Sequence, residues 1–108
     1  MNINELIVGD LSTNCYLVSD EDVLMIVDPG GEYDEIIKNI QEIGKKPKCC
    51  FLTHAHFDHI LALGEIIKKY EIPVFVNDQD LFLLKQSVDY KTIEKHLKFV
   101  KGGFEIMI

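Results

Sequence analysis

Residues 49–59, CCFLTHAHFDH, join an apolar segment to a cluster of imidazole and carboxylate side chains. The apolar part is short, which is typical of a buried β-strand, and we predict a strand over residues 48–53. Three of the chain's four histidines then fall within the next six residues. The sequence therefore predicts a strand that carries chemically active side chains at its carboxyl end.

The segments that precede this strand also read as β-structure. Valine, isoleucine, leucine and tyrosine are concentrated in three runs, and a polar turn separates the last two of them. The runs are residues 5–8, 14–18 and 23–27, with the turn at 19–22. Pro29 and the glycines that follow it stop the third strand and leave Asp28 at its tip. Local chemistry leaves two interpretations of Asp28 open, a simple turn residue before proline or a residue of a functional site.

Helical and extended patterns alternate through the rest of the chain. Ile36, Ile37, Ile40 and Ile43 share one stripe of a helix that begins near Asp34. Further helices are expected over 61–70, over 79–86 with Asp78 as the N-cap, and over 90–99, and further strands over 73–76 and 104–108. The alternation predicts an α/β architecture, with helices over a mixed sheet, in one domain of residues 1–108.

Composition excludes several classes of partner. The formal net charge of −7 disfavours nucleic acid, which is bound through lysine and arginine. No apolar run reaches the roughly 18 residues of a membrane span, so we expect no membrane partner. The three cysteines form no CxxC pair, and the first residues lack the pattern of a secretion signal, so we expect a reducing, cytoplasmic compartment.

The histidine cluster suits metal chemistry. His54 and His56 project to the same side if the extended backbone continues past the strand, and Asp58 and His59 can serve a second position nearby. Nitrogen and oxygen ligands suit zinc, with manganese or iron as alternatives. A bound dication lowers the pKa of water to about 7, which makes hydrolysis the natural reaction. Asp58 would bind one ion and orient the nucleophile or accept its proton. Ordinary polar surface residues are the competing interpretation.

The sequence HAHFDH at residues 54–59, read as HxHxDH, resembles the signature of the metallo-β-lactamase superfamily, and the chain looks like its glyoxalase-II-like branch. The runs TNCYLV at 13–18 and IVDPGG at 26–31 resemble early strands of that branch. The resemblance implies that His54 and His56 bind a first metal ion and that Asp58 and His59 bind a second, with Asp28 supporting these ligands from behind. Histidine at position 56 counts against the similar diiron flavoprotein branch, which usually carries glutamate there.

The resemblance also implies an αββα sandwich of two similar halves, of which this chain matches the N-terminal half. Further ligands belong to the other half, beginning with an HTPGH-like segment. We therefore expect a zinc hydrolase acting on a small ester or thioester, weak or inactive as this short chain. The alternative is a non-catalytic truncated or split half-domain. An uncovered sheet face would favour a homodimer or a complementing C-terminal half.

Overall fold

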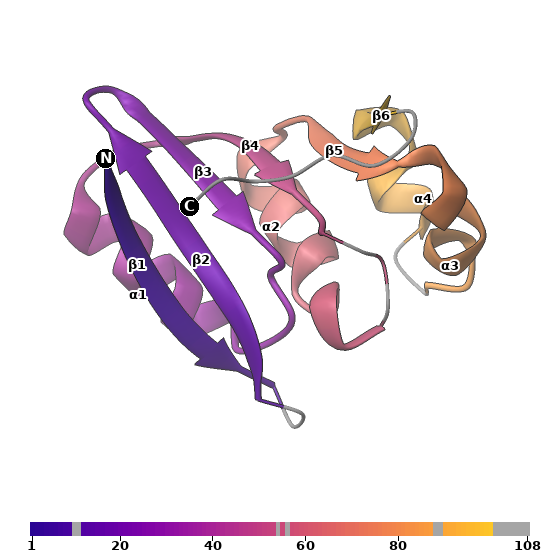
Figure 1. The fold of residues 1–108 in the computed structure, drawn as a ribbon, viewed down its shortest axis with the longest axis horizontal. Helices are drawn as coiled ribbons and strands as arrows, with labels where there is room; N and C mark the ends of the chain where they lie inside the picture. Colours follow the sequence, from indigo (N-terminus) through magenta and orange to yellow (C-terminus); the bar gives the residue numbers. More distant parts are fainter. Residues whose placement is uncertain (10–11, 54, 56, 88–89, 101–108) are drawn as a thin grey trace.

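In the computed structural model, the chain forms one mixed sheet with helices packed against a single face (Figure 1). The structure describes residues 1–9, 12–53, 55, 57–87 and 90–100. The strands are β1 (Asn2–Val8), β2 (Thr13–Asp20), β3 (Val23–Val27), β4 (Pro47–Phe51), β5 (Val74–Asn77) and β6 (Leu97–Val100). They lie in the sheet in the order of the sequence. Pairs β1·β2 and β2·β3 are antiparallel, and the later pairs are parallel.

The helices connect the parallel strands. They are α1 (Tyr33–Ile43), α2 (Leu63–Tyr70), α3 (Leu81–Lys85) and α4 (Tyr90–Ile93), with short 3₁₀ helices η1 (Phe57–His59), η2 (Asp78–Asp80) and η3 (Glu94–His96). Helices α1 and α2 lie behind the sheet in Figure 1. Two parallel neighbouring strands need a crossover connection that returns the chain to the end of the sheet where the first strand began. These helices supply it. The predicted α/β architecture, a mixed sheet with helices on one face, is confirmed.

The hydrophobic core lies between the sheet and these helices. Leu17, Ile26 and Val74 face it from the sheet, and Ile36 and Ile66 face it from α1 and α2; all five side chains are fully buried. The predicted isoleucine stripe of α1 therefore packs as expected. Each such side chain contributes about 1.5–3 kcal/mol by leaving water, so the sheet and helices depend on each other for stability.

The cysteines are part of this packing. Cys15 and Cys50 are fully buried, whereas Cys49 is half-buried because neighbouring strand residues point to opposite faces. Burial, together with the nearby Asp28 carboxylate, raises the pKa of the Cys15 thiol to about 12. Burial also raises the pKa of Cys49 and Cys50. The thiols therefore stay protonated at neutral pH and behave as small apolar groups.

The last predicted helix is wrong in its second half. The helical pattern indicated residues 90–99, but helix gives way at His96, and Leu97–Val100 forms β6. Its residues pair in parallel with β5, from Val74 opposite Leu97 to Asn77 opposite Val100. Hydrogen bonds to a strand distant in the sequence outweigh the weak helical preference of a short segment.

Other boundaries moved by small amounts. The helix predicted over 79–86 is split into η2 and α3, and its N-cap is Asn77, whose side chain accepts a hydrogen bond from the Gln79 amide. Asp78, the predicted cap, is the first residue of η2. Helix α2 begins at Leu63, two residues later than predicted. The strand predicted over 104–108 lies outside the described residues.

A row of apolar side chains crosses the other face of the sheet. Tyr16 lies opposite Val27, Val27 opposite Phe51, and Phe51 opposite Phe75, so these side chains form a row across four strands. The Phe51 and Phe75 rings stack with centroids 4.8 Å apart. None of the described helices packs on this face, since they all lie on the opposite side.

Among the described residues, no helix is both long enough and apolar enough to cross a membrane.

Candidate metal centre

Three parallel strands deliver polar side chains to one edge of the sheet. Strands β3, β4 and β5 run in the same direction, so their carboxyl ends meet at that edge, where ligands of α/β sheets commonly bind. Asp28 follows β3, residues 53–59 follow β4, and Asp80 lies just after β5. The Asp28 amide donates to the Phe51 carbonyl at 3.0 Å, which ties the first two of these ends together.

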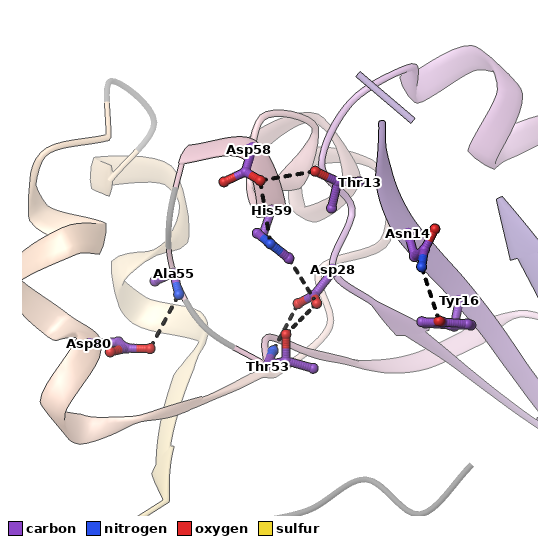
Figure 2. Close-up of polar contacts among 9 residues, drawn as sticks. All are labelled: Thr13, Asn14, Tyr16, Asp28, Thr53, Ala55, Asp58, His59 and Asp80. Atoms are coloured by element: carbon purple, nitrogen blue, oxygen red, sulfur yellow. Dashed lines mark hydrogen bonds and ion pairs between the residues drawn. The ribbon is translucent and has the colours of Figure 1, made fainter. Parts of the chain in front are cut away.

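Asp28 is the buried centre of the hydrogen-bond network (Figure 2). It is only 3% exposed, and its φ of 52° lies in the left-handed region, which aspartate tolerates better than most residues. Its Oδ1 accepts from the Thr53 amide at 2.8 Å, and its Oδ2 accepts from the Thr53 hydroxyl. The same Oδ2 lies 3.0 Å from His59 Nδ1. Asp28 therefore does more than turn the chain, because it joins both ends of the histidine-bearing loop.

The contact with Asp28 orients the His59 ring. A carboxylate oxygen beside Nδ1 favours the proton on that nitrogen, which leaves the lone pair of Nε2 pointing away from Asp28 in the neutral ring. His59 Nε2 lies 3.5 Å from Asp58 Oδ2. A carboxylate behind an imidazole in this way is the usual arrangement for histidines that bind metals.

A hydrogen bond from the start of strand β2 holds the Asp58 carboxylate. Asp58 lies in η1, and its Oδ2 accepts a hydrogen bond from the Thr13 hydroxyl at 3.1 Å (Figure 2). Thr13 is the first residue of β2 and is itself buried. The start of β2 therefore takes part in the site, although it lies 45 residues away in the sequence.

Two glycines allow the backbones around the site to approach closely. A Cβ added to Gly30 would lie 2.1 Å from the Asp58 carbonyl oxygen, and one added to Gly31 would lie 2.9 Å from Gly9 Cα. Real Cβ atoms do not approach other atoms so closely. The loop after β3 thus packs directly against η1 and against the end of β1, which places Asp28 within reach of His59.

The donor set fits a divalent ion in the part that the structure describes. Zinc binds histidine nitrogen and carboxylate oxygen at about 2.0–2.2 Å, so two such ligands on a tetrahedral ion lie roughly 3.5 Å apart. His59 Nε2 and Asp58 Oδ2 have this separation. His54 and His56 lie outside the described residues. Within the described part, no three metal-binding side chains converge, so the four-ligand set stays a prediction.

The residues that hold the loop are the ones that sequence reasoning missed. Thr13 donates a hydrogen bond to Asp58, and Thr53 donates to Asp28. Asp80 accepts a hydrogen bond from the Ala55 amide. Both threonines had a weak signal, because Thr13 begins the TNCYLV run and Thr53 ends the strand before His54. Nothing in the sequence marks Asp80, because its role depends on β5 lying beside β4.

Comparison with known proteins identifies the family. The sequence model of the metallo-β-lactamase superfamily matches residues 8–104, which is nearly the whole chain. This chain belongs to the metallo-β-lactamase superfamily. The resemblance inferred from the HxHxDH sequence is therefore confirmed.

Curated relatives within the metallo-β-lactamase superfamily include two bacterial proteins. "Probable metallo-hydrolase YqgX" of Bacillus subtilis is 44% identical over 73 residues, covering 68% of this chain and 35% of the relative. "Hydroxyacylglutathione hydrolase GloC" of Haemophilus influenzae is 34% identical over 87 residues, covering 79% of this chain and 41% of the relative. The chain thus spans less than half the length of each.

Solved structures of two proteins share the fold. BLEG-1, described as a B3 metallo-β-lactamase, is 31% identical and superposes with a TM-score of 0.72 over 77% of this chain and 40% of its own. TTHA1623, crystallised in a di-iron-bound form, is 26% identical with a TM-score of 0.72 over 94% of this chain and 54% of its own. The six-stranded sheet with its helices is therefore part of a metallo-β-lactamase fold.

Proposed function

We propose that the chain carries the metal-binding half of a hydrolase that uses an activated water on a small ester or thioester. The observation that carries this proposal is the contact of His59 Nδ1 with buried Asp28, which turns Nε2 toward Asp58. GloC is named as a hydrolase of hydroxyacylglutathione, which supports a small acyl substrate. On this proposal residues 1–108 form one unit, equivalent to the N-terminal half of the domain.

The proposed ligands are His54, His56, Asp58 and His59. The first two histidines would hold one ion, and Asp58 with His59 would hold a second. Zinc is the ion we propose, because nitrogen and oxygen donors suit it, although manganese and iron also accept this set, and TTHA1623 was crystallised with iron. The ion would supply an acidified water and polarise the acyl oxygen of the substrate.

Asp58 is the proposed catalytic residue of this chain. Thr13 occupies one lone pair of Asp58 Oδ2, so the carboxylate is held in one orientation beside His59. A carboxylate fixed in this way can orient the nucleophile or accept its proton. Asp28 does not reach the reacting atoms, and its proposed part is to hold the His59 ring in the tautomer that leaves Nε2 available.

A non-catalytic half-domain is the second candidate. It is favoured by the number of protein ligands that are proposed for the first ion. The HxHxDH sequence supplies two histidines to the first ion, whereas catalytic zinc usually takes three protein ligands. A chain that binds metal without turnover would fit this candidate.

Metal analysis and turnover together separate the two candidates. The purified chain is loaded with zinc, iron or manganese, its metal content is measured after desalting, and a generic thioester is offered as substrate. We expect bound zinc and slow hydrolysis, and a sharp reduction of both in His56→Ala. Metal without turnover would favour the half-domain. Absence of any bound metal under all three loadings would contradict the hydrolase proposal at its root.

We propose a second copy of the chain as the partner of the apolar sheet face. Ile3 and Ile7 of the edge strand β1 are 40% and 63% exposed and lie on the same side as Tyr16 and Phe75. Glu5 lies between Ile3 and Ile7 on this side, opposite Tyr16, so the apolar side chains are interrupted by one charge. Exposed apolar side chains gathered on one face are often buried in an interface. A complementing C-terminal half is the competing occupant, and a nucleic-acid partner is disfavoured by the net charge of −7.

Sedimentation velocity tests this partner. The wild-type chain is expected at twice its monomer mass at micromolar concentration, and Phe75→Thr on the sheet face is expected to shift it toward monomer. Phe82→Ser is the control, since Phe82 is 61% exposed on α3, outside the sheet. A monomeric wild type would refute self-association and leave the complementing half as the occupant.

We propose a cytoplasmic location, because the three cysteines form no disulfide among the described residues. Cys15, Cys49 and Cys50 are all free thiols, a state typical of reducing compartments.

A further inference from the structure

The loop that carries the histidines is flanked by two carboxylates, one from each neighbouring strand. Asp28 follows β3 and binds Thr53, the residue before His54. Asp80 lies beyond β5 on the other side, and its Oδ2 accepts a hydrogen bond from the Ala55 amide at 3.2 Å (Figure 2). Ala55 is the residue between His54 and His56. The loop is therefore fixed at two alternate backbone positions, each by a different aspartate.

Asp80 is presented by a well-anchored turn. It ends η2, which begins directly after β5, and the Asn77 side chain caps this turn by accepting from the Gln79 amide at 2.8 Å. Four residues later, Leu84 of α3 is fully buried in the core. Because β5 is hydrogen-bonded to β4, with the Leu52 amide donating to the Phe75 carbonyl at 2.9 Å, Asp80 is held at a fixed place beside the loop.

Ala55 is held at two points. Its methyl group is 1% exposed and belongs to the hydrophobic core. Its amide lies four residues beyond the end of β4, and a buried amide needs an acceptor. The Asp80 carboxylate meets that need with a charge-assisted hydrogen bond, which is stronger than a bond to a neutral acceptor.

We propose that Asp80 is a positioning residue of the metal-binding loop. By fixing the peptide between His54 and His56, it pre-organises the backbone from which both imidazoles project, so that less ordering is required when an ion binds. Asp80 touches neither the ion nor the substrate in this role. The inference rests on the proposed function, because it assumes that the two histidines share an ion.

Asp80 can influence the loop through its hydrogen bond to the Ala55 amide or through its negative charge alone. The asparagine variant separates these two mechanisms. In Asp80→Asn, the side-chain carbonyl can still accept from the Ala55 amide, but the negative charge is gone. Asp80→Ala removes both the acceptor and the charge. Asp78→Ala is the matched control. Asp78 lies in the same 3₁₀ helix and is exposed, so its substitution removes the same charge and leaves the Ala55 contact in place.

Two measurements on the full chain test the proposal. Zinc affinity is measured by competition with a chromophoric chelator, and hydrogen exchange of the Ala55 amide is measured by NMR without metal. Residues behind metal ligands typically account for roughly 10- to 100-fold in affinity. We expect Asp80→Ala to weaken zinc binding about tenfold and to speed exchange at Ala55. Asp80→Asn should restore most of both properties, and Asp78→Ala should match the wild type.

Wild-type affinity and exchange in Asp80→Ala would overturn the proposal. Weak zinc binding by Asp80→Asn with a protected Ala55 amide would also overturn it, because the effect would then come from charge. If the wild type bound no metal, the proposed function would fail and the role in metal binding with it. The exchange data would still show whether Asp80 holds the loop, so the two failures are distinguishable.

Discussion

Replacement of Gly30 by alanine is expected to lower the free energy of unfolding by roughly 3 kcal/mol or more, the upper end for overpacking. The added Cβ would lie 2.1 Å from the Asp58 carbonyl oxygen and 3.2 Å from its carbonyl carbon. Both are backbone atoms, so no side-chain rotation relieves the clash. Either the loop after β3 or η1 must move, which separates Asp28 from His59. Urea unfolding followed by circular dichroism measures the loss.

Gly44→Ala provides the control for this prediction. Gly44 caps α1 with a φ of 79°, but a Cβ there meets no atom within 4 Å. Its substitution adds backbone strain of about 1–2 kcal/mol and no clash. If the two variants lost the same stability, the close approach of Gly30 to η1 would not be the cause, and the account of how the loops pack would be wrong.

Asp28→Asn is expected to weaken metal binding roughly 10- to 100-fold while the chain stays folded. Asparagine tolerates the left-handed backbone at this position, and its carbonyl can still accept from the Thr53 amide. Its NH₂ group, however, would donate to His59 Nδ1. The ring proton must then move to Nε2, which removes the lone pair that a metal needs. Isothermal titration with zinc measures the change.

Asp28→Ala completes this comparison. It removes every hydrogen bond of the buried carboxylate and adds strain in the left-handed region, so we expect about 3 kcal/mol lower stability in addition to weak metal binding. Full metal affinity in Asp28→Asn would show that the tautomer of His59 is not controlled from position 28. The proposed supporting role of Asp28 would then be abandoned.

Local patterns in the sequence were sufficient for the elements with strong periodicity. The isoleucine stripe of α1 and the apolar runs of β2 and β3 predicted those elements closely, because each pattern comes from burial of one face. The helix predicted over 90–99 failed where the pattern was short. There, pairing of Leu97–Val100 with β5 supplied hydrogen bonds that no local rule contains.

The candidate site divides in the same way. HxHxDH predicted a metal-binding loop, since the ligands of one site must be close in space and these candidates are also close in sequence. Asp28 could be interpreted from the sequence as either a turn residue or part of a site, and the contact with His59 shows that it reaches the loop. Thr13 had only a weak signal in the local sequence and Asp80 had none, because their partners are 45 and 25 residues away.

Local patterns were enough to predict most strands and helices, the family, and a candidate metal-binding loop at residues 54–59, because burial patterns and candidate ligand types are properties of short segments. The residues that hold that loop could be identified only in the folded chain. Asp28, Thr13 and Asp80 lie at or just beyond the ends of three strands that meet at one edge of the sheet. Their hydrogen bonds form because strand pairing and the close approach at Gly30 bring distant backbones together.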